Sequence, residues 1–215
     1  MHISEGVLSA PVLFTGAVLT LGGLYLGIKS IKDEDIPKAA ILSAVFFTAS
    51  LIHVNVGPSS SHLLLSGVIG LLMGWAAFPV IFLGLLLQGI LFGFGGITTL
   101  GVNTFTMAAP SAICGLLFRN AVHSKSHLKA SLAALICGAL PVLISGILVA
   151  VALHFSGDAF TTVGYLIIAA NLPIVVIEGL VGMFCVQFLR KVKPDLLLTP
   201  PVLPAQTSPV ANLNE

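Results

Sequence analysis

The sequence predicts an all-α, polytopic membrane protein of about seven transmembrane helices, with the N-terminus outside and the C-terminus in the cytoplasm. Composition and the spacing of the apolar stretches predict the fold class, and the distribution of Lys and Arg predicts the orientation. Hydrophobic residues make up 57% of the chain and charged residues only 8%, whereas soluble domains contain about 25% charged residues. The mean hydropathy is +1.10.

A membrane-crossing helix requires roughly 20 predominantly apolar residues. The second, third and fourth apolar stretches are shorter, so we expect helices that are tilted, broken or joined through semi-buried loops. The proline-rich end of the chain, residues 194–215, is expected to be a disordered cytoplasmic tail that follows a single transmembrane domain at residues 1–193. The apolar stretches are residues 7–28, 39–52, 63–75, 78–94, 105–118, 128–153 and 163–189.

The basic residues fall in three places, which lie on one side of the membrane if the chain crosses it seven times. Cytoplasmic connections carry the excess of Lys and Arg, so this side is predicted to be the cytoplasm. The N-terminus and residues 53–62, 95–104 and 154–162 then share the outer side. The three basic groups are Lys29, Lys32 and Lys38; Arg119, Lys125 and Lys129; and Arg190, Lys191 and Lys193.

The first two residues, Met1 and His2, form a candidate metal chelator that would make this domain a metal-binding one. The amine of Met1, the amide nitrogen of His2 and the Nδ1 atom of His2 can close two fused chelate rings on one cation, with the three nitrogens in a plane. Planar nitrogen sites suit late first-row metals, so Co²⁺ and Ni²⁺ are the expected ions. No basic region or cleavage site precedes the first apolar stretch, so Met1 is expected to stay attached. The alternative is that Met-His is simply how the chain begins.

A fourth nitrogen is expected from the polar segment 53–62, which begins and ends with histidine. Gly57 and Pro58 prevent a continuous helix there, and non-helical backbone at membrane depth is tolerated where it lines a cavity. His62 opens the next apolar stretch and is the preferred ligand, while His53 remains an alternative. Either residue could instead be an ordinary interfacial histidine.

The glycine-rich connection at residues 95–104 is expected to lie beside the same site. Asn103 could hydrogen-bond a ligating imidazole or the N-terminus, or it could cap a helix that begins at Phe105. Ser61 and His53 are also expected close to the ligands. Glu178, the one carboxylate deep in an apolar stretch, is left without a role.

Several classes of function are excluded or disfavoured by the sequence. It has no basic patch interleaved with aromatic residues, so nucleic acid is not an expected partner. It has no H-E-x-x-H, G-x-S-x-G or phosphate-binding loop motif, so we expect a non-enzyme without a cofactor. The remaining histidines are expected at solvated or interfacial positions, and the cysteines in helix packing. These residues are His123, His127 and His154, and Cys114, Cys137 and Cys185.

Three motifs together resemble the CbiM/NikM family, the substrate-binding membrane subunit (S component) of energy-coupling-factor (ECF) ABC transporters for cobalt and nickel. The motifs are Met1-His2-Ile3-Ser4-Glu5-Gly6, Ser59-Ser60-Ser61-His62, and the Gly-Gly-Ile-Thr-Thr-Leu-Gly-Val-Asn-Thr-Phe-Thr-Met-Ala run at residues 95–108.

The resemblance implies a seven-helix fold with the N-terminus outside, in the cell membrane of a prokaryote. It also implies a square-planar site made by Met1, His2 and His62, in which Co²⁺ or Ni²⁺ is the transported ligand. The implied partners are a coupling transmembrane subunit, cytoplasmic ATPase subunits and a small auxiliary membrane protein.

Two other functions remain possible from the sequence alone. A metal-independent carrier or channel for small solutes would need a polar pathway through the bundle, yet nearly all charged residues lie at helix ends. A membrane-embedded metalloenzyme would need a general base beside the histidines, and none is evident.

Overall fold

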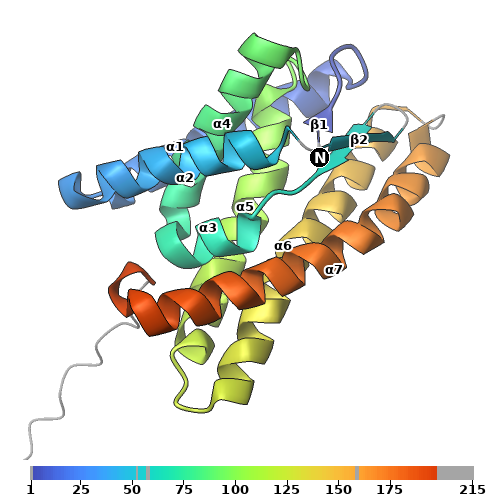
Figure 1. Ribbon diagram of the computed structural model, residues 1–215. Helices are drawn as coiled ribbons and strands as arrows, with labels where there is room; N and C mark the ends of the chain where they lie inside the picture. Colours follow the sequence, from blue (N-terminus) through green and yellow to red (C-terminus); the bar gives the residue numbers. More distant parts are fainter. Residues whose placement is uncertain (1, 52, 57–58, 158–159, 198–215) are drawn as a thin grey trace, which may run out of the picture.

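The computed structural model describes residues 2–51, 53–56, 59–157 and 160–197 and is a helical bundle with one small sheet (Figure 1). Every apolar stretch predicted from the sequence contains a helix, so the predicted all-α membrane fold is confirmed. The helices are α1 (Ala10–Ser30), α2 (Ile36–Ala49), α3 (Ser66–Met73), α4 (Ala77–Phe92), α5 (Leu100–Val122), α6 (His127–His154) and α7 (Thr161–Val192), and the strands are β1 (His2–Ile3), β2 (His53–Val56) and β3 (Ser59–His62).

Five helical segments of the described chain are long and apolar enough to cross a membrane. Helices α3 and α4 count as one of them, Ser66–Phe92, because only the 3-10 turn Gly74–Ala76 separates them. Helix α2 has 14 residues and is short for a crossing. The break after α3 lies at Gly74, whose φ of 54° and ψ of −124° are accessible only to glycine. It falls inside the predicted apolar stretch 63–75 and not at residues 76–77, which separate that stretch from the next.

Helix α5 is the centre of the bundle and contacts α1, α3, α4 and α6, while α7 packs mainly against α6. Helices α1 and α7 expose much of their apolar surface: Phe14 is 73% exposed and Tyr165 71%. Such surfaces are disfavoured in water and suit contact with lipid. The chain is therefore a multi-pass membrane protein in which α5 is shielded by its neighbours.

Glycines allow α3 to approach its neighbours at backbone distance. A Cβ atom at Gly70 would overlap the carbonyl group of Ser111 in α5, and one at Gly115 would overlap Gly70 itself. A Cβ atom at Gly67 would overlap the carbonyl group of Cys137 in α6. Small residues at helix interfaces are the usual means of close packing in lipid, and here they fix the short helix α3 against α5 and α6.

The strands were not expected, because the sequence predicted only a polar connection at residues 53–62. They form one sheet in the order β1-β3-β2, and both pairings are antiparallel. Strand β3 is central, so each of its edges has a partner. In Figure 1 the sheet lies toward the end of the bundle where α4 meets α5 and α7 begins.

The basic connections lie toward the other end of the bundle in Figure 1, at the far end of α1, between α5 and α6, and at the end of α7. Two of them meet directly, since Nη2 of Arg190 donates to the carbonyl oxygen of Ser124 at 2.7 Å. The sheet and the basic residues are thus at different ends, as an outer N-terminus and a cytoplasmic C-terminus would require. That orientation remains a prediction.

We expect Gly70→Ala to lower the free energy of unfolding by roughly 1–3 kcal/mol, because the added methyl group meets backbone that cannot move aside. Thermal unfolding in detergent micelles measures the effect. Gly22→Ala is the matched control, because nothing lies within 4 Å of a Cβ atom there. Equal unfolding midpoints for the two variants would contradict the packing described above.

Candidate metal centre

Strand β1 is buried and contains one of the predicted ligand residues, His2. His2 is 3% exposed and Ile3 is fully buried. Strand β1 pairs with β3 so that His2 lies opposite Ser60 and Ile3 opposite Ser59. The strands are antiparallel, so β1 points backwards along the chain, from Ile3 to His2, toward the end of β3 that carries His62.

The side chain of Asn103 bonds the backbone of Ile3. Its Oδ1 atom accepts a hydrogen bond from the Ile3 N–H group at 2.9 Å, and its Nδ2 atom donates to the Ile3 carbonyl at 3.1 Å. Nδ2 also lies 3.2 Å from Oγ1 of Thr99. The side-chain amide thus acts as a strand partner and satisfies both backbone groups of Ile3 in the interior.

The alternative that Asn103 caps a helix beginning at Phe105 is wrong. Helix α5 begins at Leu100, with Thr99 at the N-cap position, so Asn103 lies inside its first turn. The sequence assigned residues 95–104 to a connection because glycines and threonines are weak helix formers. Burial against α1 overrides this propensity: Gly16 approaches the backbone of Val102, and Gly101 approaches Ala17.

The connection between α4 and α5 encloses the N-terminal segment. The Glu5 N–H group donates to the carbonyl of Gly95 at 2.9 Å, and Oε1 of Glu5 accepts from the Thr98 N–H group at 3.3 Å. Gly95 has a φ of +79°, and a Cβ atom there would lie 3.0 Å from Nδ2 of Asn103 and 3.6 Å from Cβ of His2. A side chain at Gly95 would therefore be strained and crowd both residues.

The hairpin brings the two candidate histidines into register. His53 lies opposite His62, and Val54 opposite Ser61. Met1 and the side chains of His53, Ser61 and His62 lie outside the part of the chain that the structure describes. The described geometry therefore consists of the backbone of β2 and β3, the buried His2 and the Asn103 contacts.

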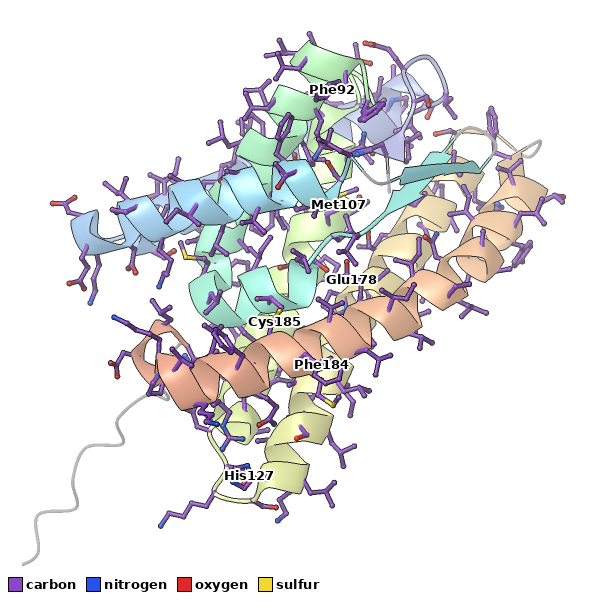
Figure 2. All side chains as sticks on the ribbon, viewed as in Figure 1. Phe92, Met107, His127, Glu178, Phe184 and Cys185 are labelled. Atoms are coloured by element: carbon purple, nitrogen blue, oxygen red, sulfur yellow. The ribbon has the colours of Figure 1, made fainter. Side chains whose placement is uncertain are left out.

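No group of three or more His, Cys, Asp or Glu side chains able to hold a metal occurs among the described residues. The predicted centre is of a different kind, because two of its four nitrogens belong to the backbone. His127 and His123 lie at the other end of the bundle, where Nδ1 of His123 is 2.7 Å from the carbonyl oxygen of Arg119. Figure 2 shows His127 there, beside the connection between α5 and α6.

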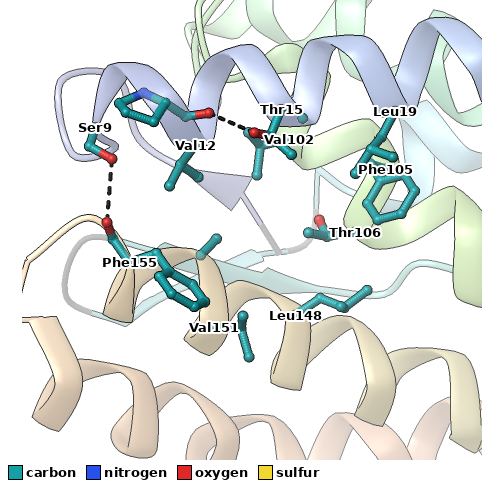
Figure 3. Close-up of a pocket in the computed structure, with 13 residues that line it drawn as sticks. Ser9, Val12, Thr15, Leu19, Val102, Phe105, Thr106, Leu148, Val151 and Phe155 are labelled. Carbon is teal, nitrogen blue, oxygen red and sulfur yellow. Dashed lines mark hydrogen bonds between the residues drawn. The ribbon is translucent and has the colours of Figure 1, made fainter.

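A cavity of about 390 Å³ lies between α1, α5 and α6 and is separate from this site (Figure 3). Among the residues described, its lining includes no histidine or carboxylate. Its walls are mostly apolar, with Val102, Phe105 and Phe155 prominent. Such a cavity suits hydrocarbon and cannot replace the hydration of a divalent cation.

Comparison with known proteins establishes the family. Residues 2–196 match the model of the CbiM family, described as "Cobalt uptake substrate-specific transmembrane region". The chain belongs to the CbiM family. The match covers all seven helices and the sheet, and the family it identifies is one of cobalt uptake transmembrane components.

Full-length relatives agree with this family assignment. A putative metal transport protein of Haemophilus influenzae is 37% identical, with 92% of this chain and 97% of the relative covered. Cobalt transport protein CbiM of Kyrpidia tusciae is 30% identical, with 92% and 86% covered. A crystal structure of a transition metal transporter superposes with a TM-score of 0.76 at 26% identity, covering 89% of this CbiM-family chain and 93% of the other.

Two relatives carry a CbiM-like region within a longer chain. One is a putative fused cobalt transport protein CbiMQ of Methanocorpusculum labreanum, 29% identical, in which the match covers 94% of this chain and 37% of the fused protein. The other is a fused nickel transport protein NikMN of Rhodobacter capsulatus, 32% identical, with 50% and 33% covered.

We expect Asn103→Leu to release the N-terminal segment, because it leaves two buried backbone groups of Ile3 without partners, at about 1–3 kcal/mol each. Hydrogen exchange of the amides of Ile3 and Glu5 should become faster. Thr106→Val is the control, since Thr106 loses only a bond to the carbonyl of Asn103 in its own helix. Equal protection of the N-terminal amides in both variants would contradict the role of Asn103.

Proposed function

We propose that this chain captures Co²⁺ or Ni²⁺ as the substrate-binding subunit of an ECF-type importer. The four ligands are the amine of Met1, the amide nitrogen of His2, Nδ1 of His2 and the imidazole of His62, in a square plane. The single observation that carries the proposal is the direction of β1. The strand leads from Ile3 through the buried His2 toward the His62 end of the central strand.

The register supports a short distance between the ligands. His2 lies opposite Ser60, and His62 is two residues further along β3, which corresponds to about 7 Å of extended strand. His53, which lies opposite His62 on the outer strand β2, is one strand further from β1. The sheet order therefore favours His62 over His53 as the fourth ligand.

The donor set determines which ions the site would hold. An amide nitrogen binds only after it loses its proton, and late first-row metals with tetragonal preferences drive that loss most readily. Metal binding then releases protons, so affinity rises with pH. Burial of His2 keeps water from competing with these nitrogens for the ion.

The proposal requires partners that hydrolyse ATP, because the sequence contains no phosphate-binding loop. The names of the fused relatives, CbiMQ and NikMN, support membrane partners joined to a CbiM-type region. We infer a coupling transmembrane subunit, cytoplasmic ATPase subunits and a small auxiliary membrane protein. The sheet faces outward and the basic end faces these ATPases.

Adding one residue before Met1, or replacing His2 with Ala, is expected to weaken Ni²⁺ and Co²⁺ binding by at least about 100-fold. The added residue moves the terminal amine away from its place beside β3, and His2→Ala removes the imidazole. Calorimetry on the purified protein measures the affinity, and mass spectrometry verifies that the added residue is retained. His127→Ala is the control at the other end of the bundle. Unchanged affinity in both N-terminal variants would overturn the proposed site.

Transport is expected to depend on the partners. Proteoliposomes that contain this chain alone should take up no Co²⁺ or Ni²⁺, whereas those that also contain the coupling and ATPase subunits should do so when ATP is supplied. Radioactive metal uptake is the measurement. Uptake by this chain alone without ATP would instead favour a carrier or channel.

A further inference from the structure

A buried carboxylate ties the segment that follows the site to helix α7. Glu178 is 1% exposed and lies near the centre of the bundle (Figure 2). Its Oε1 atom accepts hydrogen bonds from the backbone N–H groups of Leu64 and Leu65, the latter at 2.8 Å. These two residues connect strand β3 to helix α3. An ionisable group at this depth in a membrane protein is costly and is retained where it has a function.

The chain at this point needs external support. Leu65 has a φ of 53° and a ψ of 22°, the left-handed conformation that a branched side chain rarely adopts, at a cost of about 1–2 kcal/mol. It is also the N-cap residue of α3, and its side chain supplies no cap. A carboxylate from another helix therefore satisfies these N–H groups and meets the positive end of the α3 dipole.

The helices around Glu178 are in backbone contact, so this link is rigid. A Cβ atom at Gly138 of α6 would lie 2.5 Å from the carbonyl oxygen of Glu178. Gly67 of α3 approaches Cys137 and Gly138 of α6 in the same way. Helices α3, α6 and α7 thus meet at one junction, and the Glu178 carboxylate joins the start of α3 to α7.

This junction lies close in the chain to His62. Only Leu63 separates His62 from Leu64, and two residues of chain span at most about 7 Å. Helix α7 also contacts β3 itself. The end of β3 is therefore fixed on one side by the sheet register and on the other by the Glu178 bonds.

We propose that Glu178 is a positioning residue for metal capture. Through the backbone N–H groups of Leu64 and Leu65 it fixes the end of β3, and so the place from which His62 reaches the ion. The proposal rests on the function proposed above. It assigns a role to a residue whose described hydrogen bonds go to backbone N–H groups, and it makes α7 part of the binding site's support.

A double-mutant cycle with Ni²⁺ as the probe tests the assignment. In the wild-type background, Glu178→Ala should lower Ni²⁺ affinity about 10- to 100-fold, the range for groups that support metal ligands. Glu178→Gln, which keeps an oxygen acceptor but loses the charge, should have a smaller effect. In a His62→Ala background, Glu178→Ala should change the affinity by less than about twofold, because the imidazole that Glu178 positions has been removed.

The visible absorption of bound Ni²⁺ supplies a readout that a general loss of stability does not move. The Glu178→Ala spectrum should shift toward that of His62→Ala, and the Glu178→Gln spectrum should lie between wild type and Glu178→Ala. Gln187→Ala is the matched control on α7, because Gln187 bonds Ser131 of α6 at 2.6 Å and has no role near β3. It should leave affinity and spectrum unchanged.

The outcomes separate the two proposals. If His2→Ala binds Ni²⁺ with the affinity of the wild-type protein, the proposed function and this assignment are both overturned. Binding that requires His2, but that loses equal affinity on Glu178→Ala with and without His62, would overturn the role of Glu178 alone. Unchanged Ni²⁺ affinity and spectrum in both Glu178 variants would also overturn the role of Glu178 alone. If Glu178→Ala does not fold, the cycle run with Glu178→Gln decides by the same comparison.

Discussion

Strand β1 is held from two directions: it pairs with strand β3, and the side chain of Asn103 bonds both backbone groups of Ile3. Backbone polar groups inside a membrane protein must have partners within the protein, because lipid offers none. A two-residue strand has little stability of its own, so the amide of Asn103 supplies what a further strand would supply elsewhere. This pairing keeps His2 buried beside β3, and the arrangement of the predicted ligands depends on it.

The helices provide a frame that is stiff at the points where this sheet is attached. Asn103 lies in the first turn of α5, the helix that contacts α1, α3, α4 and α6. The other attachment is at the start of α3, where glycine contacts bring α3 against α5 and α6. The small sheet is therefore attached at two places where helices pack closely, the first turn of α5 and the start of α3.

Much of the fold was predictable from the sequence, because long apolar stretches and positive charges identify membrane helices with few alternatives. The strands were not, since Ser59, Ser60 and Ser61 give no alternation of polar and apolar residues and have no intrinsic preference for a sheet. The start of α5 was misplaced because local propensity at Gly101 and Asn103 opposes a helix. The contacts with α1 that favour a helix there cannot be read from the local sequence. The left-handed residue Leu65 and its bonds to Glu178 depend on residues more than a hundred positions apart, which no local pattern indicates.

The candidate site, too, could be predicted from the sequence only in part. The N-terminal Met-His pair could be recognised because its chemistry is contained in two adjacent residues. The partnership of Asn103 with Ile3 was foreseen only as a general neighbourhood, since its geometry depends on where β1 enters the bundle. Glu178 was noticed as an unusual residue, but its contact with Leu64 and Leu65 required the tertiary structure.

Strand β3 has partners along both edges. Because this pairing involves only the protein's own strands, the proposed metal site would need little adjustment and would lose little conformational entropy on binding. In the proposed transport cycle a rigid site would bind its ion tightly, so release toward the cell interior would be the demanding step. Release of the ion would then require the strands of this sheet to separate.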